Sequence, residues 1–202
     1  MLVIKCIQES LNSKQVRKQM IQNKKDLIIY LQRDMSFYYK TPIKERIINR
    51  ITADPIYYIA KYIRLLRLEE YYYNARHDFI GKLVYLYYLR KKNRLGNKLG
   101  FKIPHNTIGA GLTIYHHGEI IVNENAKIGE NCQFHGGNCI GNNGISDKSP
   151  IIGDGLDLGI GAKIIGDIKL GNNIRVGANA VVNKSFDNAN KVLVGVPAHE
   201  IK

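Results

Sequence analysis

Residues 152–182 read IGDGLDLGIGAKIIGDIKLGNNIRVGANAVV. An apolar residue returns at every sixth position of this stretch, and a glycine or another small residue often follows it. The repeated positions are Ile152, Leu158, Ile164, Leu170, Val176 and Val182. Six residues turn an α-helix by about 600°, which would scatter these side chains over its surface. The period therefore predicts a β-solenoid in which three six-residue units complete one triangular coil and the repeated residue points inward.

The same period continues toward the N-terminus and is then interrupted twice. It holds in phase at Ile128, Phe134 and Ile140. The repeated position that follows is Ser146, inside the polar residues 142–149. An inward serine without a partner would be costly, so we expect a loop that leaves the coil here.

The second interruption lies upstream, where an earlier run of isoleucines is two residues out of phase. This run consists of Ile108, Ile114 and Ile120. We expect an insertion at residues 116–119, whose sequence is His-His-Gly-Glu. Irregularities in a regular scaffold often carry function, so the two interruptions are the first candidates for a functional site.

The two halves of the 202-residue chain differ in composition. The first hundred residues hold 21 Lys and Arg against 8 Asp and Glu, and they carry the whole net charge of +13. They also hold 12 of 13 tyrosines but 3 of 19 glycines. This contrast predicts an α+β protein with a basic, Tyr-rich helical domain over residues 1–100 and a β-helix domain over residues 101–202.

Apolar spacing in the first half predicts helices over residues 15–39 and 43–51. Asp54 and Pro55 fit an N-cap and a first helical position, which predicts a third helix to about residue 73. A fourth helix is predicted over residues 78–94, with Gly96 at its end and basic residues in its last turn.

The basic cluster at residues 90–94 follows three tyrosines and allows three interpretations. The first is a solvated, charge-rich helix end, the second an anionic membrane surface, and the third a nucleic-acid patch. No recognition motif accompanies the charge, so nucleic acid is the least favoured partner. The membrane interpretation predicts salt-sensitive binding through residues 1–100.

Three cysteines are too few and too odd in number for a disulfide framework, which favours a reducing, cytoplasmic location. The N-terminus lacks a basic region followed by a long apolar stretch, and no window reaches roughly 18 uncharged apolar residues. We therefore expect neither a signal peptide nor a membrane span. The histidines lack metal-ligand spacing, and no Ser/His/Asp nucleophile arrangement is present, so we expect no metal and no covalent enzyme intermediate.

The sequence resembles the hexapeptide-repeat acyltransferases, specifically the serine acetyltransferase-like branch often found with polysaccharide biosynthesis. The matching stretches are GLTIYHHGEIIVNENAKIG (111–129), SDKSPIIGDGLDLGIGAKIIGDIKLG (146–171), RVGANAVVNKSF (175–186) and VGVPAHEI (194–201). The resemblance implies a left-handed parallel β-helix, a homotrimer, and acetyl-CoA held in a groove between neighbouring subunits. Left-handed crossovers are an exception to the general rule.

The resemblance also implies a catalytic base. Acetyl transfer to a hydroxyl needs a group that removes the hydroxyl proton, and imidazole suits this task. The family pattern places the base at His116, with His117 as the adjacent alternative. His135 is expected near the same groove one coil later, as a structural residue or acceptor contact, or as a second base.

This sequence departs from serine acetyltransferases at three positions. The family has an Asp that orients the base and another immediately before it, where this chain has Phe101 and Tyr115; Ser149 replaces a second active-site His. Without these carboxylates the ammonium of serine loses a partner, so a saccharide hydroxyl is the expected acceptor and serine the alternative. Glu119 could orient the imidazole instead. The expected acceptor contacts are Tyr115, Glu119, His135 and Ser149.

Small residues follow the repeat positions where, by resemblance, the pantetheine arm of acetyl-CoA lies against the backbone. The expected cofactor contacts are Gly161, Ala162, Gly177, Ala178, Lys184 and Pro197. Lys184 would neutralise a CoA phosphate, although a plain solvated lysine fits equally well. The sequence thus predicts an acetyl-CoA-dependent O-acetyltransferase. Two alternative hypotheses assign the chain a non-enzymatic function: a catalytically idle trimeric scaffold, or a protein that binds a membrane surface.

Overall fold

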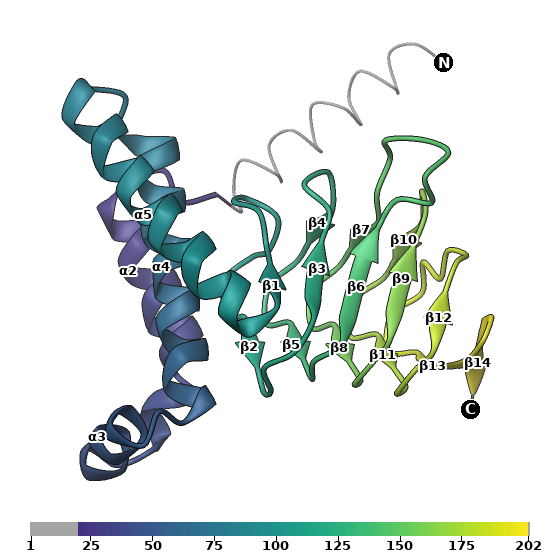
Figure 1. Ribbon diagram of the computed structural model, residues 1–202. Coiled ribbons are helices and arrows are strands. Elements are labelled where there is room, and N and C mark those ends of the chain that lie inside the picture. The colour runs from purple at the N-terminus through teal and green to yellow at the C-terminus, as the bar shows by residue number, and fades with distance from the viewer. Residues whose placement is uncertain (1–19, 202) are drawn as a thin grey trace.

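The computed structural model describes residues 20–201. In this part of the chain, a group of helices precedes a three-sided β-helix (Figure 1). The start of the helix predicted over residues 15–39 lies outside this range. The helical elements are α2 (Lys24–Met35), the short 3-10 helix η1 (Tyr38–Lys40), α3 (Ile43–Ile51), α4 (Pro55–Ala75) and α5 (Phe79–Leu99). Asp54 caps α4 as predicted, because its side chain accepts a 2.8 Å hydrogen bond from the Ile56 N–H. Among residues 20–201, no helix is long and apolar enough to cross a membrane.

The end of α5 differs from the prediction. Gly96 lies inside the helix, and Gly100 ends it in a left-handed conformation with φ of 80°. A Cβ at Gly96 would lie 2.5 Å from the carbonyl oxygen of Phe101 and 3.1 Å from the ring of Tyr62. Position 96 therefore requires glycine because the neighbouring segment of the chain leaves no room for a side chain. The residue that ends the helix is Gly100.

The β-helix contains fourteen short strands among the described residues, which form three sheets. They are β1 (Phe101–Lys102), β2 (Thr113–Ile114), β3 (Ile120–Val122), β4 (Lys127–Ile128), β5 (Gln133–Phe134), β6 (Asn138–Gly141), β7 (Ile151–Ile152), β8 (Asp157–Leu158), β9 (Lys163–Ile165), β10 (Lys169–Leu170), β11 (Arg175–Val176), β12 (Val181–Val182), β13 (Val192–Gly195) and β14 (Ala198–Ile201).

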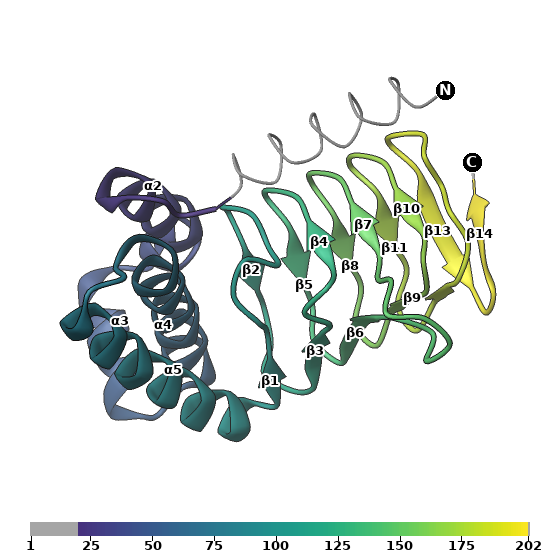
Figure 2. The same cartoon turned by 90° about the horizontal axis from the view of Figure 1, so that it is seen from above.

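The sheets have the strand orders β1-β3-β6-β9-β12, β10-β7-β4 and β14-β13-β11-β8-β5-β2. Strands β1 to β13 each pair in parallel with a strand one coil away, and β14 pairs antiparallel with β13 in a hairpin. Figure 2 shows the strands of successive coils side by side along the axis of the β-helix. The solved structures that this chain resembles have the same architecture, so the predicted α+β fold with a left-handed parallel β-helix is confirmed.

The register between coils locates both predicted irregularities. Ile114 pairs with Phe134, 20 residues ahead, whereas Ile120 pairs with Asn138, 18 residues ahead, so two extra residues lie in the turn 115–119. One correction follows: Val122, rather than Ile120, stacks on Ile140 in the repeated position. Across the polar residues 142–149 the offset rises to 24, which equals one coil of 18 plus one additional unit. Residues 143–148 are all exposed, as expected of a loop.

The repeated apolar residues form a continuous core along the axis of the β-helix. Every repeated position from Ile128 to Val182 except Ser146 is at most 4% exposed. The same cluster of buried side chains extends into the helical part through Leu66, Ile63 and Met35. The helices therefore close the first coil of the solenoid, whose end would otherwise expose its apolar core.

A buried charge network joins the helices to this first coil. The side chain of Arg67 in α4 is fully buried, and its Nε donates to the Asp34 carboxylate at 2.7 Å. Its Nη atoms donate to Glu70 and to the carbonyl oxygens of Ile108 and Gly109. Burial alone would lower the pKa of Arg67, but the two carboxylates outweigh it and raise the pKa above its usual value.

Asp34 completes the connection, because its other oxygen accepts backbone N–H groups of the first coil. Gly111 donates at 2.6 Å and Leu112 at 2.9 Å. A second buried pair lies beside it, where Lys92 donates to Glu69 at 2.7 Å and to the Ile103 carbonyl. The basic cluster at residues 90–94 is therefore not wholly solvated as the first interpretation supposed, since Lys92 is 4% exposed.

We predict that Arg67→Ala lowers the free energy of unfolding by about 3–5 kcal/mol, because Asp34 and Glu70 would remain buried without a counter-charge. Arg33→Ala is the matched control. Arg33 also bridges the two parts of the chain, through Glu130 at 2.8 Å, but both side chains are 34% exposed. Its loss should cost at most about 1 kcal/mol. Urea denaturation measures both values, and equal losses would contradict the role given to the buried network.

Gly100→Ala should lower the free energy of unfolding by about 1–2 kcal/mol through its positive φ alone. An added methyl group would also lie 3.0 Å from the Gly118 carbonyl group. Gly144→Ala is the control, because Gly144 has a φ of 73° and no atom within 4 Å of the added methyl. Thermal unfolding should show a larger loss for Gly100→Ala. Identical losses would mean that the contact with Gly118 is unimportant.

Candidate active site

One corner of the β-helix carries the three candidate histidines, His116, His117 and His135. We call it the His116 corner and define it as the turns 115–119, 135–137, 159–161 and 177–179. Each turn follows a strand of the six-stranded sheet and precedes a strand of the five-stranded sheet. The first turn has five residues and the next has three, so the inserted residues protrude from the corner.

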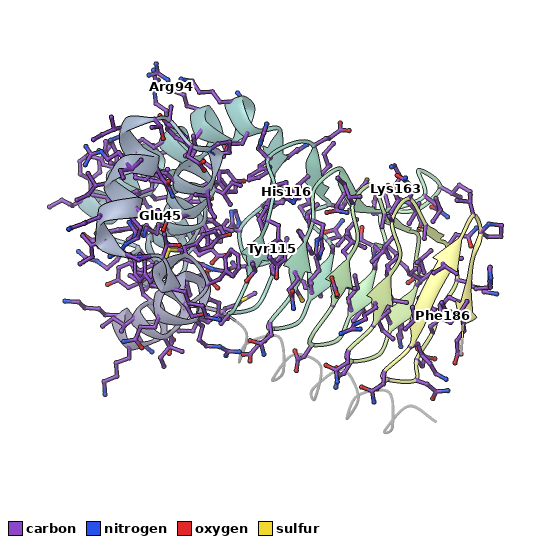
Figure 3. All side chains as sticks on the ribbon, turned by 90° about the horizontal axis from the view of Figure 1, so that it is seen from below. Glu45, Arg94, Tyr115, His116, Lys163 and Phe186 are labelled. Atoms are coloured by element: carbon purple, nitrogen blue, oxygen red, sulfur yellow. The ribbon has the colours of Figure 1, made fainter. Side chains whose placement is uncertain are left out.

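His116 and His117 are both exposed on this first turn. Figure 3 shows His116 on the β-helix next to the helical part. A Cβ at Gly136 would lie 3.6 Å from the Cβ of His116, so His116 lies above a glycine of the next coil. Within residues 20–201, His116 makes no hydrogen bond. Glu119 is also exposed, and the interaction with the imidazole that we expected of it does not form in the single chain.

The end of α5 holds this turn in place. The N–H of Gly118 donates to the Leu99 carbonyl at 3.0 Å, and the N–H of Ile120 donates to the Gly100 carbonyl at 2.9 Å. The last carbonyls of a helix need donors from outside the helix. The inserted turn supplies them, which positions His116 relative to the helical part.

Aromatic side chains occupy the place beside His116. The Tyr115 ring stacks on His135 with ring centroids 4.6 Å apart, and the ring of Phe37 from the helical part contacts Tyr115 edge-on with centroids 5.1 Å apart. The Tyr115 hydroxyl donates to Gln133 at 2.7 Å. Phe101, at the other position where the family has an Asp, is 5% exposed and packs against Tyr62. Neither position therefore offers a carboxylate to an acceptor.

His135 has the carboxylate partner that His116 lacks. Its Nε2 lies 2.9 Å from Oδ1 of Asp157 on the following coil, and both side chains are about one-third exposed. The Arg175 guanidinium lies 3.8 Å from the same carboxylate. The sequence analysis did not identify Asp157, Arg175, Gln133 or Phe37. Three of them precede repeated positions on one face, so the coil register would have shown that they stack; Phe37 had no such signal.

The expected cofactor contacts fall in three places. The His116 corner contains Gly161, Gly177 and Ala178. Pro197 lies in the turn between β13 and β14, which belong to the six-stranded sheet. The side chain of Ala162 is buried in the core, so that residue could offer only its backbone to a ligand. Lys184 is exposed at the adjoining corner, where its Nζ lies 5.4 Å from the Phe186 ring centroid.

Ser149 also lies outside the His116 corner, at the end of the loop 142–149. It is 6% exposed, and its Oγ has no hydrogen-bond partner among the described residues. Within one chain, Ser149 and Lys184 are therefore not brought together with His116. Residues 20–201 contain no group of three or more His, Cys, Asp or Glu side chains that could hold a metal ion.

Comparisons with known proteins agree with the fold. No family model matches the chain. A serine acetyltransferase of Mycobacterium tuberculosis is 37% identical over 100 residues, which are 48% of this chain and 43% of that protein. Serine acetyltransferase in complex with coenzyme A from Brucella abortus strain S19 is 25% identical with a TM-score of 0.66, covering 93% of this chain and 72% of that chain. Neisseria gonorrhoeae serine acetyltransferase is 25% identical with a TM-score of 0.64, covering 89% and 68%.

These likenesses confirm the resemblance to the hexapeptide-repeat acyltransferases. The similar proteins are named serine acetyltransferases, and the serine acetyltransferase-like branch fits the chain. The chain spans about half the length of the curated relatives it matches. The saccharide acceptor expected from the sequence is not confirmed, and the similar proteins bear the name of the alternative, serine acetyltransferase.

Proposed function

We propose that this protein is an acetyl-CoA-dependent O-acetyltransferase in which His116 is the general base. The observation that carries the proposal is the inserted turn, which exposes His116 on the same corner as Gly161, Gly177 and Ala178. Small residues let a ligand approach the backbone closely. The corner therefore suits an extended thioester lying along the axis with its reactive end near the imidazole.

The reaction is a direct transfer. His116 removes the proton from the acceptor hydroxyl as its oxygen attacks the thioester carbonyl. The tetrahedral intermediate collapses, the carbon–sulfur bond breaks, and the imidazolium returns the proton to the departing thiolate. The products are the acetyl ester and free CoA. His117, on the same turn, is the second candidate for the base.

Serine is the first candidate acceptor. The relatives and solved structures that resemble this chain are named serine acetyltransferases, and the likeness to the solved structures includes the helical part. Asp157 lies beside this corner, and in the single chain its carboxylate is paired with His135. Binding of a serine ammonium there would require that pair to open.

A saccharide hydroxyl is the second candidate. The observation that favours it is the aromatic surface of Tyr115 beside His116, together with the burial of Phe101. A neutral sugar ring needs no carboxylate, and aromatic faces suit its apolar side. Initial rates of thiol release with L-serine and with a panel of saccharides distinguish the two candidates. A higher kcat/KM with a saccharide would replace serine as the acceptor.

A homotrimer belongs to the same proposal. In one chain His116 is exposed and unpaired, and Ser149 and Lys184 lie at a different corner. In the trimer, the corner of a neighbouring β-helix that carries Ser149 and Lys184 would lie against the His116 corner. A groove would form between the two copies. The interpretation as an idle scaffold predicts the same trimer without acetyl transfer. The cytoplasmic location expected from the sequence stays a prediction.

His116→Ala should lower kcat about 10²–10⁴-fold, because the hydroxyl proton would lose its acceptor. His117→Ala should change kcat by much less, and neither variant should alter thermal stability, since both side chains are exposed. The measurement is CoA release from acetyl-CoA with acceptor present. If His135→Ala abolished activity and His116→Ala did not, the base would be His135. Equal inactivity of wild type and variants would support the scaffold.

Ala178→Trp should raise KM for acetyl-CoA about tenfold or more, because the indole would fill the path along the corner. Ala189→Trp is the matched control, since Ala189 is also exposed but lies at the third corner, in the turn before β13. Steady-state kinetics with varied acetyl-CoA measure both. An unchanged KM for Ala178→Trp would remove the thioester from this corner.

A further inference from the structure

A pocket in the helical part has no role in the proposed reaction. It lies between η1, α3 and the first half of α4 and has a volume of about 380 Å³. Figure 1 shows that α3 stands away from the β-helix, so the pocket does not belong to the His116 corner. Its size is within the range of pockets that hold small ligands.

The charge of this pocket is unbalanced. Four basic side chains line it: Arg46, Arg50, Lys61 and Arg64. None of the described residues that line it carries a carboxylate. Elsewhere in the helical part the buried cations Arg67 and Lys92 each contact a carboxylate at 2.7 Å. Within residues 20–201, the four cations of the pocket form no ion pair.

Two of the guanidiniums contact the same aromatic ring, and neither is paired with an anion in the described part of the chain. The Cζ of Arg46 lies 4.5 Å from the Tyr39 ring centroid, and the Cζ of Arg64 lies 5.2 Å from the same ring. The Nε of Arg46 is shielded from water and has no hydrogen-bond partner in the described part of the chain. Burial lowers the pKa of Arg64. A shielded donor without an acceptor is costly, and an anion would satisfy it.

The remaining walls are apolar and aromatic. Ile43 and Ile47 line the pocket and are 67% and 53% exposed, and Ile56 and Tyr57 line it from α4. Exposed isoleucines beside a basic pocket could cover an apolar group attached to the anion. Several cations around one space favour a group with more than one negative charge, and guanidinium matches phosphate geometry.

We propose that this pocket binds a phosphate-bearing ligand with an apolar or aromatic group attached. Arg46 and Arg64 hold the phosphate oxygens, and Arg50 and Lys61 add charge at the rim. Ile43, Ile47 and Tyr57 contact the attached group. Phosphate of this kind occurs in soluble phosphorylated metabolites and in lipid headgroups, and the experiment separates these sources. The site does not depend on acetyl transfer, so its test uses binding alone.

Isothermal titration of the full-length protein with phenyl phosphate tests the soluble source. We expect binding that is tighter than for inorganic phosphate and absent for phenol. The double variant Arg46→Gln, Arg64→Gln should weaken binding about tenfold or more, because it removes both guanidinium partners of the phosphate. Arg94→Gln is the matched control: Arg94 is an exposed arginine of α5 that does not line the pocket. It should change Kd less than twofold.

Because Arg46 is partly buried, a second variant guards against a folding defect. Arg50→Gln with Lys61→Gln changes two exposed side chains and should weaken binding about threefold or more while circular dichroism stays unchanged. Co-sedimentation with phosphatidylcholine vesicles containing phosphatidic acid tests the lipid source. Vesicle binding lost in the Arg46/Arg64 variant and kept in Arg94→Gln supports a headgroup in the pocket.

Binding of phenyl phosphate without vesicle binding supports a soluble ligand. The proposal is overturned if the wild-type protein binds neither phenyl phosphate nor the vesicles. It is equally overturned if Arg94→Gln weakens binding as much as the pocket variants do, since binding would then reflect overall surface charge.

Discussion

Arg67 is the group on which the attachment of the helices to the β-helix depends. It is fully buried between Asp34 and Glu70, and it also donates to two carbonyls of the first coil. Each member of this network satisfies the others, and removal of any one would leave a charge in a medium that cannot solvate it. α2, α4 and the first coil are thereby fixed together. The apolar core continues across the same boundary, so the helical part also covers the open end of the solenoid.

This attachment has a consequence for the proposed chemistry. The last carbonyls of α5 accept hydrogen bonds from the turn that carries His116, and Phe37 packs against Tyr115 on the same corner. The histidine therefore takes its position from the helical part as well as from the coil. Preorganisation of this kind is what a general base requires, because a small displacement of the base costs rate. Where serine acetyltransferases are expected to have a carboxylate beside the base, this chain has Tyr115, whose ring stacks on His135. The carboxylate of Asp157 contacts His135 and not the proposed base, His116.

The β-helix was predictable because the six-residue period determines which side chains point inward. The conformation of the turns between the strands does not change those positions. The repeated positions, the loop at residues 142–149 and the insertion before Ile120 all follow from counting. Helix ends were less predictable. Gly96 has the residue type of a helix terminus, but its lack of a side chain serves a close contact with Phe101, which the sequence does not reveal. The resemblance made His116 a candidate, and its role stays a prediction. The coil register places Asp157 on the same face as Gln133, but the pairing of Asp157 with His135, 22 residues away, departs from that 24-residue register and could not be read from it.

The sequence by itself determined the solenoid, the basic helical half and the candidate base, because these rest on periodicity and on local residue type. Only the tertiary structure decided how charges are partnered. Lys92 and Arg67 look like members of a solvated basic half in the sequence, yet each is buried against carboxylates, whereas Arg46 and Arg64 are left facing a pocket without one. Pairing depends on which side chains meet across helices and coils, and the packing of the whole chain sets those distances.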